Sequence, residues 1–165
     1  MRLSRALYFG LLGLLILRFV THLSSLPPVV ASHFGPGGQP DGWMSRGVFA
    51  VFGLLPVVVS LIVVVAAPLM TARLPASMIN LPNKDYWLTP ERRAQAFSKL
   101  AAEMEWFGAG LVAFFIFTYE LVFIANQNGA PLAEGPFLVG LLVFFAGAIY
   151  SVYRTFKAFE VPEGP

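Results

Sequence analysis

The sequence predicts an all-α integral membrane protein, a four-transmembrane-helix bundle with both termini in the cytoplasm. Apolar residues make up 57% of the 165-residue chain and charged residues only 12%, about half the charged share of an ordinary soluble domain. Four long apolar segments follow one another, and lysine and arginine are concentrated on alternate connections between them. A chain with so few charges cannot cover a soluble core, so lipid is its expected solvent.

Each apolar segment is long enough to cross a hydrocarbon core of about 30 Å. The most apolar one, residues 48–70, contains no charged residue. We expect a single membrane domain with helices at residues 6–24, 47–72, 104–126 and 136–157. A basic start before the first span is also typical of a signal peptide, but Arg18 and the lack of a small-residue cleavage site favour a retained helix.

The distribution of basic residues orients the bundle. Nine lysines and arginines lie at the two termini and between the second and third spans, at positions 2, 5, 73, 84, 92, 93, 99, 154 and 157. The other two connections contain only Arg46. Because basic connections stay in the cytoplasm, we expect cytoplasmic termini, a cytoplasmic amphipathic segment at 73–103 and an outer loop at 25–46.

The cytoplasmic segment at 73–103 joins the second and third helices. Thr89, followed by a proline, is typical of a helix N-terminus, and apolar residues then recur at helical spacing. We therefore expect an amphipathic helix that lies in the membrane surface or runs straight into the third span. Trp87, Arg92 and Arg93 are candidates for a cytoplasmic interface. They belong either to a solvated linker that contacts anionic lipid or to a docking surface for a cytoplasmic partner.

Two charged residues interrupt the apolar spans. Arg18 lies in the first helix and Glu120 in the third, each about six residues from the outer end, so the two reach a similar depth. An unpaired charge inside the bilayer costs about 2.5–3.5 kcal/mol, which pairing relieves. We expect an intramembrane ion pair that makes the two helices neighbours. The pair either fixes helix register or forms a proton or ligand site open to the outside, which His22 would join. Snorkelling of Arg18 to the outer surface is the other alternative.

The outer loop at 25–46 is rich in residues that form turns. Two prolines end the first helix. A short strand is expected to begin at the two valines that follow and to end at Ser32-His33-Phe34, and glycine- and proline-rich turns come next. The candidates for binding in or near this loop are His22, His33, Asp41 and Trp43. Together with Glu134 of the other outer loop they offer imidazole and carboxylate ligands, but no clustered histidines support a zinc site. We therefore expect no metal and no other cofactor.

The order of residues in this loop resembles a known pattern. A Leu-Pro pair is followed by a short hydrophobic stretch, His-Phe, a glycine-rich turn, Pro-Asp-Gly, an aromatic residue and a basic residue that opens the next helix. The pattern is similar to the signature loop of a bacterial membrane family of unknown function, whose unit forms the N-terminal part of SdpI-like immunity proteins. The matching positions are Pro27, His33, Phe34, Gly38, Asp41, Gly42 and Arg46.

The resemblance covers the first helix, the loop and the second helix, and the stretch from Pro82 to Arg93 also looks like short members of the same family. It implies a location in the bacterial cytoplasmic (inner) membrane. It also makes immunity to a secreted toxic peptide one candidate role. The sequence differs from the immunity proteins in having four spans, where those proteins continue with further ones.

Several function classes are excluded by the composition and the motifs. The chain has no nucleophile with a neighbouring base, no phosphate loop and no metalloprotease signature, so we do not expect an enzyme. A net charge of only +2 does not suit nucleic-acid binding, and the lack of cysteine excludes disulfides and thiolate metal sites. We expect a non-enzymatic multi-pass membrane protein, either an accessory subunit of a membrane complex or an SdpI-like immunity or binding factor. The alternative is a small oligomeric transporter or channel component that uses an Arg18–Glu120 pocket.

The expected partners are the lipid bilayer, another membrane protein or a second copy of the chain, and an extracytoplasmic peptide. A binding or accessory role predicts that a flat face of small residues interrupts the lipid-facing surface. A transporter instead predicts polar residues along a continuous path through the membrane.

Overall fold

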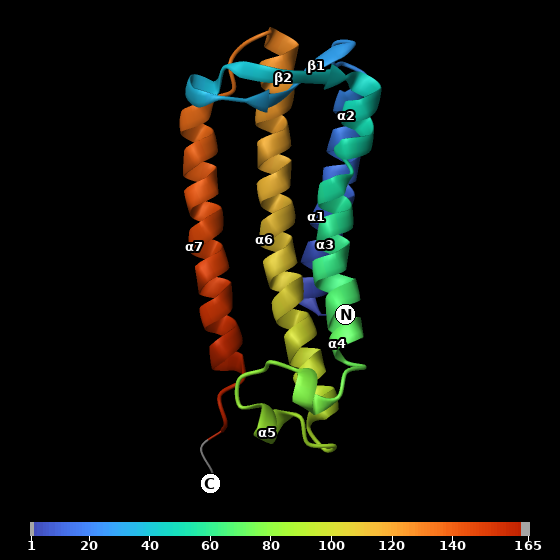
Figure 1. Ribbon diagram of the computed structural model, residues 1–165, viewed down its shortest axis with the longest axis vertical. Coiled ribbons are helices and arrows are strands. Elements are labelled where there is room, and N and C mark those ends of the chain that lie inside the picture. Colours follow the sequence, from blue (N-terminus) through green and yellow to red (C-terminus); the bar gives the residue numbers. More distant parts are fainter. Residues whose placement is uncertain (1, 163–165) are drawn as a thin grey trace.

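Four long helices stand side by side in the computed structural model, which describes residues 2–162 (Figure 1). They are α1 (Leu3–Leu23), the second span (Arg46–Thr71), α6 (Arg93–Asn128) and α7 (Glu134–Ala158). All four are long and apolar enough to cross a membrane, as the sequence predicts. A small sheet closes one end of the bundle, which we call the hairpin end. Both chain termini lie toward the other end, the termini end (Figure 1).

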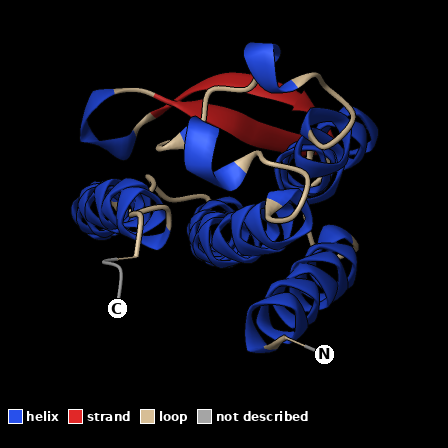
Figure 2. Cartoon of the chain, turned by 90° about the horizontal axis from the view of Figure 1, so that it is seen from below, coloured by secondary structure: helices blue, strands red, loops and turns tan. Residues whose placement is uncertain are grey.

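The central helix of the bundle is α6. It packs against α1, against the second span and against α7. Seen along the bundle axis, α7 stands on the flank of α6 that is away from α1 and the second span (Figure 2). None of the 25 residues of α7 is buried, whereas α1 buries five of its residues. The bundle is therefore a cluster of three spans with α7 added at one side.

The second span is interrupted, as its two prolines predict. Its parts are α2 (Arg46–Phe52), α3 (Leu55–Leu61), a π-helical turn (Ile62–Ala66) and α4 (Ala67–Thr71). Pro56 follows the break between α2 and α3, and Pro68 follows the π-helical turn. The hydroxyl of Tyr119 on α6 donates to the carbonyl of Gly53, inside the first break. A neighbouring helix thus supplies the hydrogen bond that the broken helix lacks.

A buried polar contact lies inside the three-span cluster. Tyr8 and Ser60 are fully buried, and the Tyr8 hydroxyl donates to the Ser60 oxygen at 3.2 Å. Apolar side chains surround this contact: Leu12, Leu15, Val64, Ala109 and Val112. A side chain at Gly108 would clash with Tyr8 and Val64. The close approach of α6 to the first two spans therefore requires glycine at this position.

The outer loop expected at 25–46 contains a paired β-hairpin. β1 (Val29–Phe34) pairs with antiparallel β2 (Pro40–Ser45) across a 3₁₀ turn at Pro36–Gly38. β1 lies where the sequence predicts a short strand, whereas β2 is not predicted, because Pro40–Ser45 begins with turn-forming residues. The hairpin is thus an ordered cap and not a simple connector.

Hydrogen bonds at this hairpin and at its base connect the ends of the helices. The side-chain amide of Asn126, near the end of α6, accepts from the N–H of Ala31 at 2.7 Å and donates to its carbonyl at 3.0 Å. The Arg46 guanidinium donates to the carbonyl of Leu26, after the end of α1, at 2.9 Å. The N–H of Leu132, just before α7, donates to the Gly38 carbonyl at 2.8 Å. The hairpin therefore fixes the relative positions of the helix ends.

At the termini end, the connection to α6 is folded back on the bundle. It contains a 3₁₀ turn (Ala76–Met78) and α5 (Lys84–Trp87). α6 begins at Arg93 and not near residue 104, so the amphipathic part of this segment is the first part of the third span. No proline occurs between Arg93 and Asn128, which explains the unbroken helix. Thr89 does not cap α6, whose N-cap residue is Arg92.

Candidate functional site

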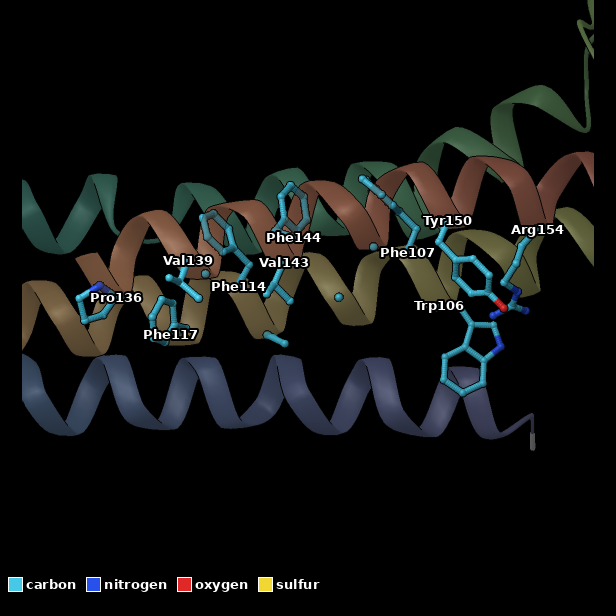
Figure 3. Close-up of a pocket in the computed structure, with 16 residues that line it drawn as sticks. Trp106, Phe107, Phe114, Phe117, Pro136, Val139, Val143, Phe144, Tyr150 and Arg154 are labelled. Atoms are coloured by element: carbon cyan, nitrogen blue, oxygen red, sulfur yellow. The ribbon is translucent and has the colours of Figure 1, made fainter. Parts of the chain in front are cut away.

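A groove of about 790 Å³ runs between α6 and α7 (Figure 3). Residues from Trp106 to Phe117 on α6 and from Pro136 to Arg154 on α7 line it, and most of them are aromatic, aliphatic or small. Its length along α7 is about 27 Å at the rise of an α-helix, close to the thickness of a hydrocarbon core. Its volume falls within the range of about 300–1,000 Å³ that is usual for small-ligand sites. We call it the α6–α7 groove.

The groove exists because α7 is held to the rest of the protein at both of its ends. At the hairpin end, the backbone N–H of Gly37 donates to the Glu134 carboxylate at 3.2 Å, next to the bond between Leu132 and Gly38. At the termini end, the carbonyl of Phe159 accepts from the Trp87 indole at 2.8 Å and from the Asn83 amide at 2.9 Å. Lys99 on α6 donates to the Ala158 carbonyl at 3.0 Å. These bonds position α7 without closing the space beside α6.

Aromatic rings hold α6 and α7 apart between these two attachments. Phe114 of α6 and Phe144 of α7 stack with their centroids 4.9 Å apart, and Phe107 lies 6.4 Å from Phe144. Gly140 lies directly against the ring of Phe117. Gly147, in contrast, also lines the groove but has no atom within 4 Å of where a Cβ would lie. The rings therefore act as spacers, and the small residues between them leave the groove empty.

One end of the groove is polar. Arg154 donates to the Glu103 carboxylate at 3.0 Å, and its guanidinium lies 5.7 Å from the centroid of the Trp106 ring. Tyr150 lies one turn before Arg154, and all three groove residues lie at the same end (Figure 3). Among the described residues, the Tyr150 hydroxyl and the Trp106 indole N–H have no hydrogen-bond partner, and one oxygen of Glu103 is buried without a donor. An apolar channel thus ends in a cluster of unused hydrogen-bond donors.

The structure brings Arg18 and Glu120 together at the seam between α1 and α6. Arg18 Nε lies 2.8 Å from Glu120 Oε1. The two side chains are 46% and 27% exposed, so the pair lies on the surface of the bundle and outside the α6–α7 groove. His22 bonds to the backbone carbonyl of Arg18 at 3.0 Å and packs against Phe123. Its ring therefore contributes to packing at the seam and not to an enclosed charged pocket.

The other candidate residues of the outer loop lie on the hairpin. His33 Nδ1 bonds to Asp41 Oδ1 across the two strands, and both side chains are exposed. Trp43 is exposed on β2. Glu134 bonds to the turn of the hairpin, as described above, and does not join His33 and Asp41. No group of three or more possible metal ligands occurs among the described residues.

The three residues expected at the cytoplasmic interface serve the folding of the connection before α6. Trp87 is buried against Phe159, so its ring packs within the fold. Arg93 donates to the carbonyl of Ala72 at 3.1 Å, which ties the start of α6 to the end of the second span. Arg92 lies over the ring of Tyr86. Each of these side chains is engaged within the fold. Their contacts therefore do not support a docking surface for a cytoplasmic partner.

Sequence reasoning missed a buried charge cluster at the termini end. Glu105 is buried and bonds to Arg2 at 3.1 Å, to Arg5 at 2.9 Å and to the Ser4 hydroxyl at 2.6 Å. Glu103, two residues earlier, pairs with Arg154 on the opposite side. The sequence does contain a signal for this cluster. Two glutamates lie near the start of a span, basic residues lie at both termini, and a buried carboxylate requires a partner. Basic residues at the termini therefore hold helices together in addition to orienting the chain.

The comparison with known families places the hairpin in a recognised unit. Residues 10–59, less than a third of the chain, match a domain of unknown function, DUF1648. The match comprises most of α1, the hairpin, α2 and part of α3, and includes every signature position named above. No curated protein and no solved structure matched the chain. The α6–α7 groove lies entirely outside the matched segment.

Proposed function

We propose that this chain is a non-enzymatic binding protein of the membrane that takes a membrane-embedded ligand into the α6–α7 groove. The groove carries this proposal, because it is a ligand-sized hollow between two helices that aromatic rings hold apart. Apolar walls with a few polar groups at one end are usual for ligand sites. In this view the DUF1648 segment is the scaffold, and its hairpin positions the start of α7.

A transporter is the weaker alternative. Transporter sites lie near the midplane, where broken helices expose backbone groups to the substrate. The second span is broken here, but the polar groups beside it, Tyr8 and Ser60, are fully buried and bonded to each other. Arg18 and Glu120 lie nearer the hairpin end, on the surface of the bundle. Within residues 2–162 these groups form no continuous polar path.

An accessory subunit of a membrane complex is the second candidate function. It is favoured by the exposure of α7, on which Leu142, Val143 and Ile149 are 69%, 67% and 72% exposed. A transmembrane helix of a partner protein would cover this face and pack closely where glycines lie. The surface is hollowed and not flat, however, which favours a chain-like ligand over a helix. An immunity factor would be the special case in which the ligand is a peptide from outside the cell.

We also propose an orientation, with the termini end in the cytoplasm of a bacterial cell. The preponderance of lysine and arginine at that end supports this orientation. The hairpin would then face the outside, and the polar end of the groove would lie at the cytoplasmic leaflet.

Site-specific photo-crosslinking tests the proposed function. A benzophenone amino acid would replace Val143, which lines the groove, and, as a control, Leu17 on α1, which is 60% exposed outside it. After irradiation in cells, the intact mass of the extracted protein shows what was captured. We expect one defined low-mass adduct at position 143 and a heterogeneous set of lipid adducts at position 17. A protein-sized adduct at 143 would identify an accessory subunit, and identical patterns at both positions would contradict a binding groove.

A further inference from the structure

We infer that the ligand of the α6–α7 groove is an anionic phospholipid, with its phosphate at Arg154 and one acyl chain along α7 as far as Phe144. This inference rests on the proposed function, because it names the ligand of the same groove. Along its length the groove offers an apolar channel and then a cluster of hydrogen-bond donors. A phospholipid has an acyl chain and a head group that match these two features in the same order.

The polar end of the groove suits a phosphate group. Arg154 uses one of its five N–H donors on Glu103, and the Tyr150 hydroxyl and the Trp106 indole offer two further donors. Tyrosine and tryptophan also prefer the depth of the lipid head groups. An anion would therefore find several donors where the membrane interface is expected.

The charge near this end is positive. Lys157 lies one turn beyond Arg154 on α7, and Lys99 lies on α6 beside the end of α7. Against these three positive charges stand the carboxylates of Glu103 and Glu160. The surplus favours an anionic head group over a zwitterionic one, because the latter brings no net charge to the site.

The length of the channel fits one acyl chain of a single leaflet. Half of a hydrocarbon core is about 15 Å, which corresponds to ten residues of helix. Ten residues lead from Arg154 to Phe144, where the stacked rings of Phe114 and Phe144 occupy the middle of the groove. Gly147 and Gly110 line the part between, so the chain can lie close to both backbones.

Lipid retention measured by native mass spectrometry tests this inference. The purified protein would be exchanged into detergent with equal amounts of phosphatidylglycerol and phosphatidylcholine that carry identical acyl chains. We expect one phosphatidylglycerol per chain to be retained in preference to phosphatidylcholine. Arg154→Gln should lower that retention about tenfold, the effect of losing about 1.4 kcal/mol from a charge-assisted contact. Tyr150→Phe should lower it less, and Glu103→Gln, which frees Arg154, should not lower it.

Two glycine variants separate the failure of this inference from the failure of the proposed function. Gly147→Leu adds a side chain inside the groove, at a position where a Cβ has no atom within 4 Å, and Gly13→Leu adds the same side chain at an equally open position on α1. We expect retention to be lost only in Gly147→Leu. Retention that is blocked by Gly147→Leu but shows no preference for phosphatidylglycerol, or no response to Arg154→Gln and Tyr150→Phe, would overturn the anionic lipid and leave the groove as a binding site. Retention that is insensitive to Gly147→Leu would overturn both.

Discussion

A single side chain supplies the hydrogen bond that the backbone lacks where the second span is broken. The Gly53 carbonyl lies at the break before Pro56 and would be unsatisfied in lipid without the hydroxyl of Tyr119. In a medium without water, this bond replaces one that a continuous helix would have made within itself. Tyr8 on α1 bonds instead to the side chain of Ser60 in α3, so it joins two spans without satisfying the backbone. The break before Pro56 is therefore compatible with the membrane because α6 places the Tyr119 hydroxyl beside it.

Removing one of these hydroxyls should cost stability without changing the fold. We expect Tyr119→Phe to lower the free energy of unfolding by about 1 kcal/mol, the net value of one buried hydrogen bond. Unfolding in mixed detergent and SDS micelles would measure the difference. Tyr153→Phe on α7 is the matched control, because Tyr153 is 57% exposed. Equal stability of the two variants would contradict the role of Tyr119 in satisfying the break.

The Arg18–Glu120 pair makes a second prediction at the level of residues. Arg18→Leu leaves Glu120 charged and unpaired at the lipid-facing seam, which we expect to destabilise the protein by about 1–3 kcal/mol. The double variant Arg18→Leu/Glu120→Leu removes both charges and should recover part of this loss. The same unfolding assay compares the three proteins. A single variant as stable as the double one would show that the contact does not couple the two helices.

At the scale of elements, the hairpin depends on a glycine in its turn. Gly37 and Gly38 both have φ near +71°, a region that disfavours other residues. Around Gly37 there is open space, whereas a side chain at Gly38 would meet the carbonyl of Leu132. The two positions thus carry the same backbone strain and differ only in their contact with the start of α7.

This difference allows a matched test of how the hairpin holds α7. Gly37→Ala should destabilise the protein by about 1 kcal/mol through backbone strain alone. Gly38→Ala should cost clearly more and should speed hydrogen exchange at the N–H of Leu132, which bonds to Gly38. Exchange measured by mass spectrometry on peptides that contain Leu132 provides the readout. Identical exchange in the two variants would mean that this bond does not hold α7.

The sequence predicts the individual helices better than the contacts between elements. Hydrophobic length alone locates the four spans, and the depth of Arg18 and Glu120 in the sequence suggests the contact that the structure contains. The pairing of β2 is not predictable in the same way, because Pro40–Ser45 becomes a strand through its partner and not through its own propensity. The groove is also hidden, because it depends on the distance between two helices, which the sequence of neither helix determines.

At the scale of the whole molecule, the chain divides into a three-span cluster, part of which matches a known domain, and an added helix. The segment that matches DUF1648 contains most of α1, the hairpin and the first half of the second span, and α6 completes the packed cluster. α7 packs along α6 and is bonded to the rest of the protein at both ends, but none of its residues is buried. Because α7 adds little to the packed core, its attachment at both ends is consistent with the binding role that we propose for the groove.

The orientation of the molecule determines which leaflet the polar end of the groove meets. The chain contains no cysteine, so single cysteines report topology without a background. Gln39 and Ser77 are exposed at the hairpin end and at the termini end. We expect a membrane-impermeant maleimide to label Gln39→Cys in intact cells, and Ser77→Cys only after lysis, because basic residues retain their connections in the cytoplasm.

The opposite labelling would show that the bundle has the reverse orientation. It would also change which leaflet supplies the ligand of the groove. The cytoplasmic leaflet carries a negative surface potential, which arises from anionic lipids. With the termini end in the cytoplasm, Arg154 and Lys157 would draw on that leaflet for the phospholipid of the groove. In a reversed protein the same residues would face the outer leaflet, and His33 and Asp41 on the hairpin would lie in the cytoplasm instead of outside it. Labelling of Gln39→Cys before lysis is therefore a condition for an extracytoplasmic peptide to reach the hairpin at all.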